Sequence, residues 1–164
     1  MGRPRIIKII KLTEAYKIRS PLTKKEWADY DSFRWDILRK PLKLSHIPLK
    51  DNLEDISLHL MGIDNKNNIV SCGRLHMNSS TEAQIRYMGV SREHRRRGIG
   101  KAMINELESK ALLQGAKKMV LNARSEAIIF YASLGYLETG PYESDIKIPH
   151  SSMEKSLDLS LIHI

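Results

Sequence analysis

Residues 87–101 read YMGVSREHRRRGIGK and decide the fold of this chain. The segment begins as a short strand, passes through a basic turn with two glycines, Gly98 and Gly100, and continues as a helix. A helix start offers unpaired backbone amides, and glycines let the backbone approach a ligand without an intervening side chain. Together with the three arginines at 95–97, this pattern favours an anionic ligand, and a phosphate or pyrophosphate fits best.

The spacing of the glycines excludes two common phosphate loops. A P-loop needs glycine, four residues and then Gly-Lys-Ser/Thr, but Arg95 holds the first glycine position and Ala102 follows Lys101. The dinucleotide fingerprint needs a third glycine where this chain has Met103. What remains is the pattern Arg95-x-x-Gly98-x-Gly100, which by itself also fits a basic helix start whose glycines serve only the turn.

The composition of the 164 residues is that of one globular domain, because 41% are hydrophobic and 28% are charged. Cys72 is the single cysteine, which excludes an internal disulfide and favours a reducing, cytoplasmic location. No apolar run approaches the roughly 18 residues of a membrane span. Residues 6–12 are too short and too interrupted by lysine for a secretory signal, so we expect no membrane association.

The net charge of +8 is concentrated in residues 1–50, which hold 13 Lys and Arg against 5 Asp and Glu. Such a segment can meet nucleic acid, anionic lipid or an acidic partner. No aromatic-interleaved basic motif accompanies it, so we interpret it as a solvated face and expect no nucleic-acid partner. Residues 1–13 form a basic N-terminal extension that fits either an edge strand or an amphipathic arm.

Periodicity and turn residues predict strands and helices in one α/β (α+β) domain. Thr23 and Glu26 form a capping box for a helix that ends before Pro41, and Ser125 is the expected N-cap of the last helix. Another helix follows Gly98. Strands are expected over 15–19, 56–63, 68–76, 83–90, 118–122, 136–141 and 146–157. We therefore predict a mixed, mostly antiparallel central sheet of six to seven strands, flanked by helices.

Several motifs together resemble the GNAT superfamily of acetyl-coenzyme A-dependent N-acetyltransferases. Arg95-x-x-Gly98-x-Gly100 is similar to its acyl-coenzyme A signature, and residues 127–136, AIIFYASLGY, resemble its second hallmark. Segments 33–41, 73–76, 84–88 and 148–153 resemble a bacterial-type subgroup. The resemblance covers residues 15–157 and implies a single GNAT domain over 14–157, preceded by the extension 1–13 and followed by a tail, 158–164.

The resemblance implies transfer of an acetyl group from acetyl-coenzyme A to a primary amine of a small molecule or a protein. It implies direct attack by the amine, with a backbone amide near Val90 polarising the thioester carbonyl. No histidine pair has ligand-like spacing, so no metal is expected. The predicted cofactor-binding residues are Met88, Gly89, Val90, Arg95, Arg96, Arg97, Gly98, Ile99, Gly100, Lys101 and Asn122.

Tyr131 is the predicted general acid, which protonates the departing thiolate of coenzyme A. A tyrosine buried on an amphipathic face would fit the same position, and the match to the Phe-Tyr pair of the second hallmark favours catalysis. Glu143 and His150 lie in the terminal strands that border the acceptor side of this fold. We predict that they supply the general base jointly.

Two other classes of function stay open. A degenerate family member would bind acyl-coenzyme A as a sensor or interaction module, but the presence of both Tyr131 and the 95–100 signature favours an enzyme. A basic binder of nucleic acid or membranes would act through residues 1–50. The acidic cluster at 51–55 is interpreted as a solvated loop rather than a site for a cationic amine. The exposed edge strands of this fold also allow a homodimer.

Overall fold

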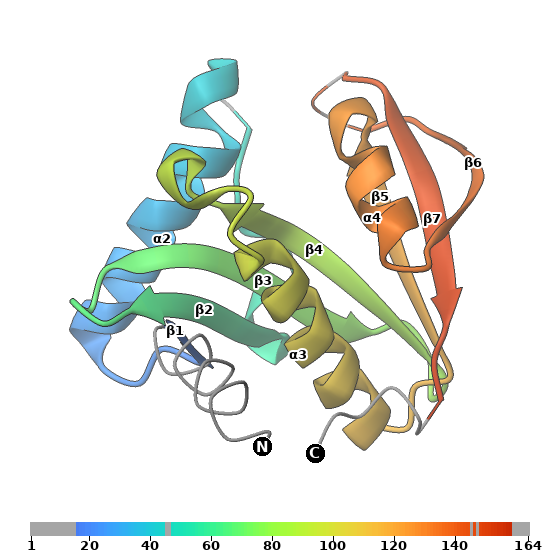
Figure 1. The fold of residues 1–164 in the computed structure, drawn as a ribbon, viewed down its shortest axis with the longest axis horizontal. Helices are drawn as coiled ribbons and strands as arrows, with labels where there is room; N and C mark the ends of the chain where they lie inside the picture. The colour runs from blue at the N-terminus through green and yellow to red at the C-terminus, as the bar shows by residue number, and fades with distance from the viewer. Residues whose placement is uncertain (1–15, 45–46, 145, 147, 159–164) are drawn as a thin grey trace, which may run out of the picture.

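The structure is a computed structural model that describes residues 16–44, 47–144, 146 and 148–158. The predicted extension over 1–13 and nearly all of the predicted tail lie outside the described residues. Figure 1 shows a twisted sheet with helices on both faces. The strands are β1 (Tyr16–Arg19), β2 (Leu58–Asp64), β3 (Ile69–Met77), β4 (Glu82–Val90), β5 (Lys118–Arg124), β6 (Leu137–Tyr142) and β7 (His150–Ser156), and the helices are α2 (Lys24–Leu38), α3 (Ile99–Leu113) and α4 (Ile128–Ser133).

Within the described residues the seven strands form one sheet in the order β1-β2-β3-β4-β5-β7-β6. Five of the six neighbouring pairs are antiparallel, and β4 with β5 is the parallel pair. This architecture confirms the predicted mixed, mostly antiparallel sheet. The parallel pair requires a crossover connection, which α3 provides.

Of the two N-caps predicted from sequence, Thr23 and Ser125, one is confirmed and the other is not. The Thr23 hydroxyl accepts a bond from the Glu26 amide at 3.1 Å, which confirms the capping box of α2. The prediction for Ser125 is wrong, because α4 has Ala127 as its N-cap, without a side-chain bond. The Ser125 hydroxyl instead donates to the carbonyl of Pro149 at 3.2 Å, which ties the start of α4 to the segment before β7.

A β-bulge in β4 lies next to the place where β4 and β5 separate. The register pairs Cys72 with Gly89 and Arg74 with Arg86, so β4 carries one residue more than β3 between these pairs. Tyr87 lies in this bulge with a φ of 51°, in the left-handed region that non-glycine residues rarely adopt. The ladder between β4 and β5 spans only Glu82–Gln84 and Lys118–Val120. Beyond it the two strands diverge (Figure 1).

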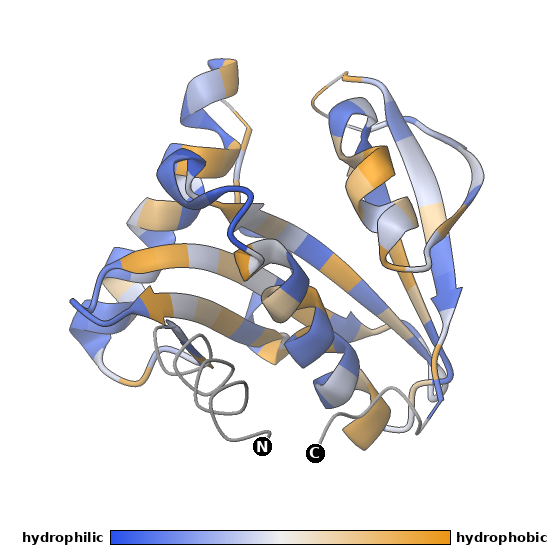
Figure 2. Ribbon diagram, in the orientation of Figure 1, coloured by the Kyte–Doolittle hydropathy of each residue, from blue (hydrophilic) through white to orange (hydrophobic). Residues whose placement is uncertain are grey.

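The two faces of the sheet bury different groups. On the face of α3 and α4, an apolar core contains the fully buried Leu75, Met103 and Met119. Figure 2 shows apolar residues along the strands and a strongly hydrophilic connection between β4 and α3. On the opposite face α2 covers a smaller apolar cluster around Tyr30 and then gives way to charged side chains.

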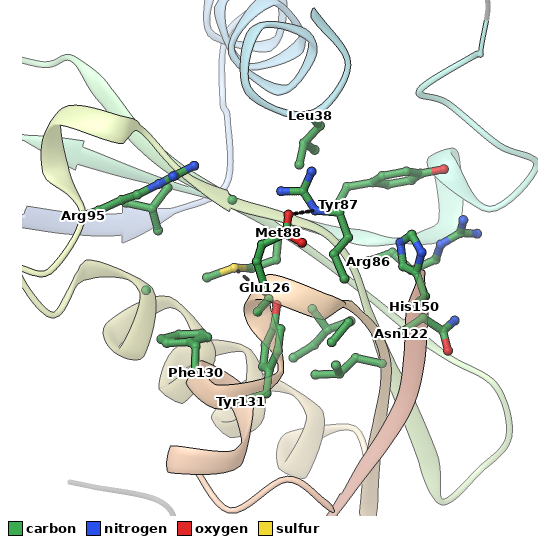
Figure 3. Close-up of a pocket in the computed structure, with 18 of the residues that line it drawn as sticks. Leu38, Arg86, Tyr87, Met88, Arg95, Asn122, Glu126, Phe130, Tyr131 and His150 are labelled. Carbon is green, nitrogen blue, oxygen red and sulfur yellow. Dashed lines mark hydrogen bonds and ion pairs between the residues drawn. The ribbon is translucent and has the colours of Figure 1, made fainter. Parts of the chain in front are cut away.

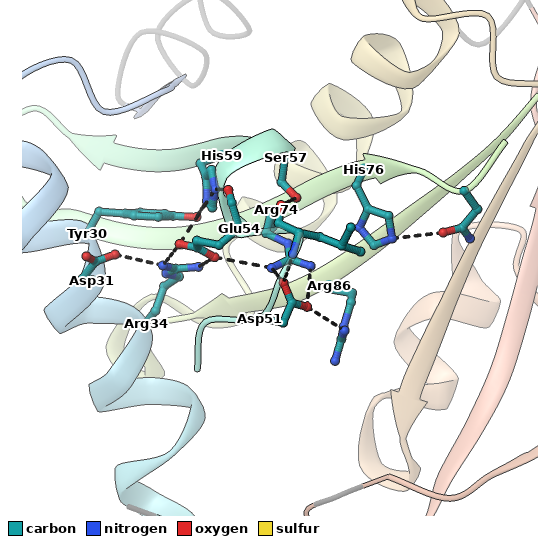
Figure 4. A network of polar contacts seen from close by, with 12 residues as sticks. Tyr30, Asp31, Arg34, Asp51, Glu54, Ser57, His59, Arg74, His76 and Arg86 are labelled. Carbon is teal, nitrogen blue, oxygen red and sulfur yellow. Dashed lines mark hydrogen bonds and ion pairs between the residues drawn. The ribbon is translucent and has the colours of Figure 1, made fainter. Parts of the chain in front are cut away.

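Those charged side chains form a buried ion-pair network (Figure 4). Arg34 and Arg74 have no exposed surface, and they contact Glu54 at 2.5 Å and Asp51 at 2.8 Å, respectively. Arg86 also reaches Asp51, at 2.9 Å. The hydrogen bond from Arg74 lowers the pKa of Asp51 to about 2. The interpretation of residues 51–55 as a solvated loop is therefore wrong for Asp51 and Glu54, which neutralise cations brought in by α2 and β3.

We expect Glu54→Gln to destabilise the fold, because it removes a charge shared by two buried guanidinium groups. Breaking a buried ion pair from one side costs about 3 kcal/mol. Chemical denaturation should show this loss as a lower midpoint at an unchanged m-value. Asp29→Asn is the matched control, since its pair with Lys25 is exposed and should contribute nothing measurable. An equal midpoint in the two variants would contradict the structural role of Glu54.

Candidate active site

A cavity of about 680 Å³ opens where β4 and β5 diverge. Figure 3 shows Arg95 toward one end of it, Met88 and Tyr131 in the middle, and Arg86, Asn122 and His150 toward the other end. The residues predicted from sequence that line this cavity are Met88, Gly89, Val90, Arg95, Arg96, Gly98, Gly100, Lys101, Asn122, Tyr131 and His150.

Three predicted residues do not line the cavity. Ile99 is 4% exposed and belongs to the core, so at most its backbone faces a ligand. Arg97 and Glu143 are exposed and do not line the cavity. The structure therefore does not bring Glu143 and His150 together at the cavity, and of this pair only His150 lines it.

The basic turn has the backbone shape of an anion cradle. Arg96 and Gly98 both have positive φ, 65° and 79°, which turns successive amides toward one side. Gly98 is the N-cap of α3 and makes no side-chain cap, so the first amides of this 15-residue helix have no side-chain acceptor. A Cβ on Gly98 would meet no protein atom within 4 Å, so the space above it is open.

The other two glycines of the site serve packing as well. A Cβ on Gly100 would lie 3.0 Å from the ring of Phe130, so this glycine lets α3 approach α4. A Cβ on Gly89 would lie 2.6 Å from the side chain of Ile37, so this glycine lets α2 pack on β4. Both positions therefore shape the cavity through its walls.

The backbone of β4 offers an amide to the open side. The Ser91 amide donates to the carbonyl of Val70 on β3 at 2.8 Å. Because amides alternate in direction along a strand, the preceding amide of Val90 points away from β3 and toward the gap left by β5. An amide in this position can polarise a carbonyl oxygen placed between the strands.

Tyr131 lies at the centre of the cavity wall. It is 7% exposed, and its hydroxyl contacts the sulfur of Met88 at 3.7 Å (Figure 3). The rings of Phe130 and Tyr136 hold it edge-on, with centroids at 5.1 and 5.8 Å. Burial raises the pKa of Tyr131 to about 12, so the phenol keeps its proton at neutral pH. The side chain is thus a protonated phenol whose hydroxyl faces the sulfur of Met88.

His150 and Asn122 face the end of the cavity remote from Arg95. The Nδ1 atom of His150 lies within hydrogen-bond distance of the carbonyl of Ile148, which requires that nitrogen to be the donor. With Nδ1 as the donor, Nε2 is the ring nitrogen that is able to accept a hydrogen bond. Asn122 accepts a bond from the Ser152 hydroxyl at 2.9 Å, which fixes its amide against β7.

Sequence reasoning missed part of the cavity wall. Arg39, Arg86, Arg124 and Glu126 also line it. Arg86 and Arg124 follow the alternation of β4 and β5, but their place in the site depends on how far those strands diverge. Arg39 is the C-cap of α2 and follows no recognisable pattern, so nothing in the sequence singles it out.

The described part of the chain contains no helix long and apolar enough to cross a membrane. Among the same residues, no three His, Cys, Asp or Glu gather as metal ligands. Cys72 is fully buried, and burial raises the pKa of its thiol to about 12, so it is not a nucleophile at neutral pH. The cytoplasmic location inferred from this cysteine stays a prediction.

Comparison with known proteins agrees with this geometry. The family model described as the acetyltransferase (GNAT) family matches residues 12–136. An uncharacterised N-acetyltransferase, YjcF, of Bacillus subtilis (strain 168) is 33% identical over 106 residues, which cover 64% of this chain and 74% of that protein. The chain therefore belongs to the GNAT acetyltransferase family and is an acyltransferase.

Solved structures share the fold at low sequence identity. A GNAT-family acetyltransferase from Staphylococcus aureus Mu50 superposes with a TM-score of 0.73 at 18% identity, covering 88% of this chain and all of that one. A GNAT acetyltransferase from Elizabethkingia anophelis, solved with acetyl-CoA bound, gives a TM-score of 0.67 at 17% identity and covers 88% of this chain and 100% of its own. These matches confirm the predicted fold class.

Gly98→Ala should weaken binding of coenzyme A, because it places a methyl group in the open space of the cradle and strains a positive-φ residue. Loss of one charge-assisted amide contact predicts about a tenfold weaker Kd in calorimetric titration. Gly115→Ala is the matched control: Gly115 has a φ of 95° but lies outside the cavity, at the far end of α3. It should lose stability yet keep its affinity. Equal affinities of the two variants for coenzyme A would show that the backbone turn at Gly98 is not part of the binding site.

Proposed function

We propose that this chain transfers an acetyl group from acetyl-coenzyme A to a primary amine, of a small molecule or a protein, by direct attack with Tyr131 as general acid. The observation that carries the proposal is a single cavity that joins the α3 cradle to a buried phenol between two diverging strands. The cradle suits the pyrophosphate, and the gap between β4 and β5 suits the extended pantetheine arm.

The donor is held by complementary charge and backbone polarity. The amides at the start of α3 bind the pyrophosphate at the positive end of the helix dipole, and Arg95, Arg96 and Lys101 add charge-assisted bonds. The arm runs along β4 with its thioester carbonyl at the Val90 amide. That amide stabilises the oxyanion that forms when the amine nitrogen attacks the carbonyl carbon.

Collapse of the tetrahedral intermediate breaks the C–S bond and moves its electron pair to sulfur. The Tyr131 hydroxyl donates a hydrogen bond to this sulfur and passes its proton to it as the bond breaks. Burial keeps the Tyr131 phenol protonated until the departing sulfur takes up the proton.

The acceptor must lose a proton before or during its attack. His150 is our first choice for the base, because it lines the cavity with Nε2 as a proton acceptor. Glu143 is the second choice: its side chain lies outside the cavity, but it directly follows Tyr142, which lines it. Asn122, on the same side, orients the acceptor or the end of the pantetheine arm.

Tyr131→Phe should lower kcat by about a hundredfold while the Kd for acetyl-coenzyme A changes by less than about threefold, because only the departing thiolate needs the hydroxyl. Steady-state thiol release and calorimetry measure the two quantities. Tyr136→Phe is the control, since this buried hydroxyl bonds Glu108 at 2.8 Å and lies outside the cavity. Wild-type turnover in the Tyr131 variant would show that the assigned role is wrong.

The competing proposal is an acyl-coenzyme A-binding sensor without turnover. The proton-donating Tyr131 and the Val90 amide favour the enzyme, because a sensor needs neither in the middle of the cavity. Incubation of acetyl-coenzyme A with a panel of amines separates the two. Tight binding with no thiol release above the background rate would favour the sensor.

A homodimer is the assembly that we propose, formed at the β6 edge of the sheet. This edge strand is largely exposed and carries Leu137, at 72% exposure, at its start and Tyr142, at 40%, at its end. An exposed strand edge with apolar side chains is a template for pairing. Sedimentation should show a dimer that Leu137→Glu dissociates, whereas a wild-type monomer at micromolar concentration would refute this assembly.

A further inference from the structure

The cavity has a second cationic region, remote from the phosphate cradle. Arg39, Arg86 and Arg124 line it from three different elements: the end of α2, the strand β4 and the strand β5. Figure 3 places Arg86 at the end opposite Arg95. Coenzyme A is proposed to deliver its phosphates at the Arg95 end, so this second group of arginines meets the acceptor.

Arg39 is the unusual member of this group. Only 8% of its surface is exposed, and its Nε atom has no hydrogen-bond partner among the described residues. Within the same residues, the guanidinium makes one hydrogen bond, from a terminal nitrogen to the adjacent carbonyl of Leu38 at 3.3 Å. No carboxylate of the described residues lies within ion-pair distance of it. Burial, together with the positive charges of Arg86 and Arg124, lowers the pKa of Arg39.

The other buried arginines show what Arg39 lacks. Arg34 and Arg74 each contact two carboxylates. Burying a cation without a counterion costs several kcal/mol of folding free energy. A protein therefore retains such a cation only where another interaction offsets that cost. A cation–π contact with Tyr87, whose ring centroid is 5.8 Å from the Arg39 guanidinium, offsets part of this cost. The cavity supplies the remaining space for a counterion.

The carboxylates already present do not fill that role. Glu126 lines the cavity, but it is 64% exposed and pairs with Arg124 at 3.3 Å. Asp51 is shared between Arg74 and Arg86 in the buried network. The region therefore carries three arginines and a single lining carboxylate among the described residues, which leaves a net positive charge.

We propose that the amine acceptor also carries an anionic group, a carboxylate or a phosphate, which Arg39 and Arg86 bind. This inference rests on the proposed acetyltransferase function and names its substrate class. A polyamine would bring further positive charge to this region and is disfavoured. Arg39 and Arg86 line the same cavity as Tyr131, so one acceptor molecule can reach both the arginines and the reacting centre.

The first test is anion binding to the protein saturated with coenzyme A, in which the phosphate cradle is already filled. Succinate and inorganic phosphate are titrated separately and followed by NMR chemical shifts. We expect saturable binding of at least one of them that Arg39→Met weakens at least tenfold, because a charge-assisted contact is lost. Lys40→Met removes the same charge from the adjacent, exposed residue and should leave the affinity unchanged.

Two results would overturn the proposal. The first is no binding of either anion to the coenzyme A complex. The second is equal binding in wild type and Arg39→Met, which would mean an adventitious ion only. Arg39→Met should fold with a melting temperature no lower than that of wild type, since it removes an unpaired buried cation. Should it fail to fold, Arg39→Lys gives the same reading, because it keeps the charge but loses the planar donor pair.

The second test compares kcat/KM for paired acceptors: glycine with glycinamide, β-alanine with its amide, phosphoethanolamine with ethanolamine, and spermidine as the polycation. We expect the anionic member of a pair to be preferred at least tenfold, and Arg39→Met to abolish that preference while Lys40→Met keeps it. The pair with the larger ratio of kcat/KM values distinguishes a carboxylate from a phosphate.

Preference of the wild type for neutral amines or spermidine would overturn this inference alone. An absence of coenzyme A binding would overturn the proposed function itself.

Discussion

The divergence of β4 from β5 is the constraint on which the rest of this molecule depends. The bulge at Tyr87 gives β4 one residue more than β3, and the parallel ladder to β5 spans only Glu82–Gln84. A continuous hydrogen-bond ladder is interrupted at the centre of the sheet. The gap exposes backbone amides, has room for an extended ligand arm and places the buried Tyr131 beside it. The positive φ of Tyr87 belongs to the bulge that lies next to this opening.

The arginines of this fold form groups that differ in burial and in whether a carboxylate contacts them. Arg34 and Arg74 have carboxylate partners and belong to the architecture, since they bind α2, β3 and the segment around Asp51 into one unit. Arg95 and Arg96 of the basic turn are exposed and line the end of the cavity that is proposed for the donor. Arg39 is buried like the first group but, among the residues that the structure describes, no carboxylate contacts it. A buried arginine without a carboxylate partner is unfavourable in the protein without a ligand. The burial of Arg39 therefore points to a ligand that carries a negative charge.

Short-range patterns in the sequence were enough to predict residues for the donor side of the site. The acceptor side depends on contacts between residues that lie far apart in the chain, which the sequence alone does not reveal. The helix start at Gly98 and the capping box at Thr23 depend on spacings of a few residues, and the structure contains both. Tyr131 lines the cavity, and its catalytic role stays a prediction. Ser125 failed as a cap because its hydroxyl finds a carbonyl 24 residues away. The roles of Asp51 and Glu54 are set by arginines on α2 and β3, so the sequence alone made them look solvated. Arg39 has no local pattern at all.

Amide hydrogen exchange with and without acetyl-coenzyme A tests most directly whether the gap between β4 and β5 holds the donor. Exchange reports which backbone amides become hydrogen-bonded or excluded from water. The structure predicts fast exchange of the Val90 amide and of the first turn of α3 in the free protein, and strong protection of both in the complex. Protection of the ladder at Glu82–Gln84 should not change. Binding of acetyl-coenzyme A that leaves Val90 and the start of α3 unprotected would contradict the account.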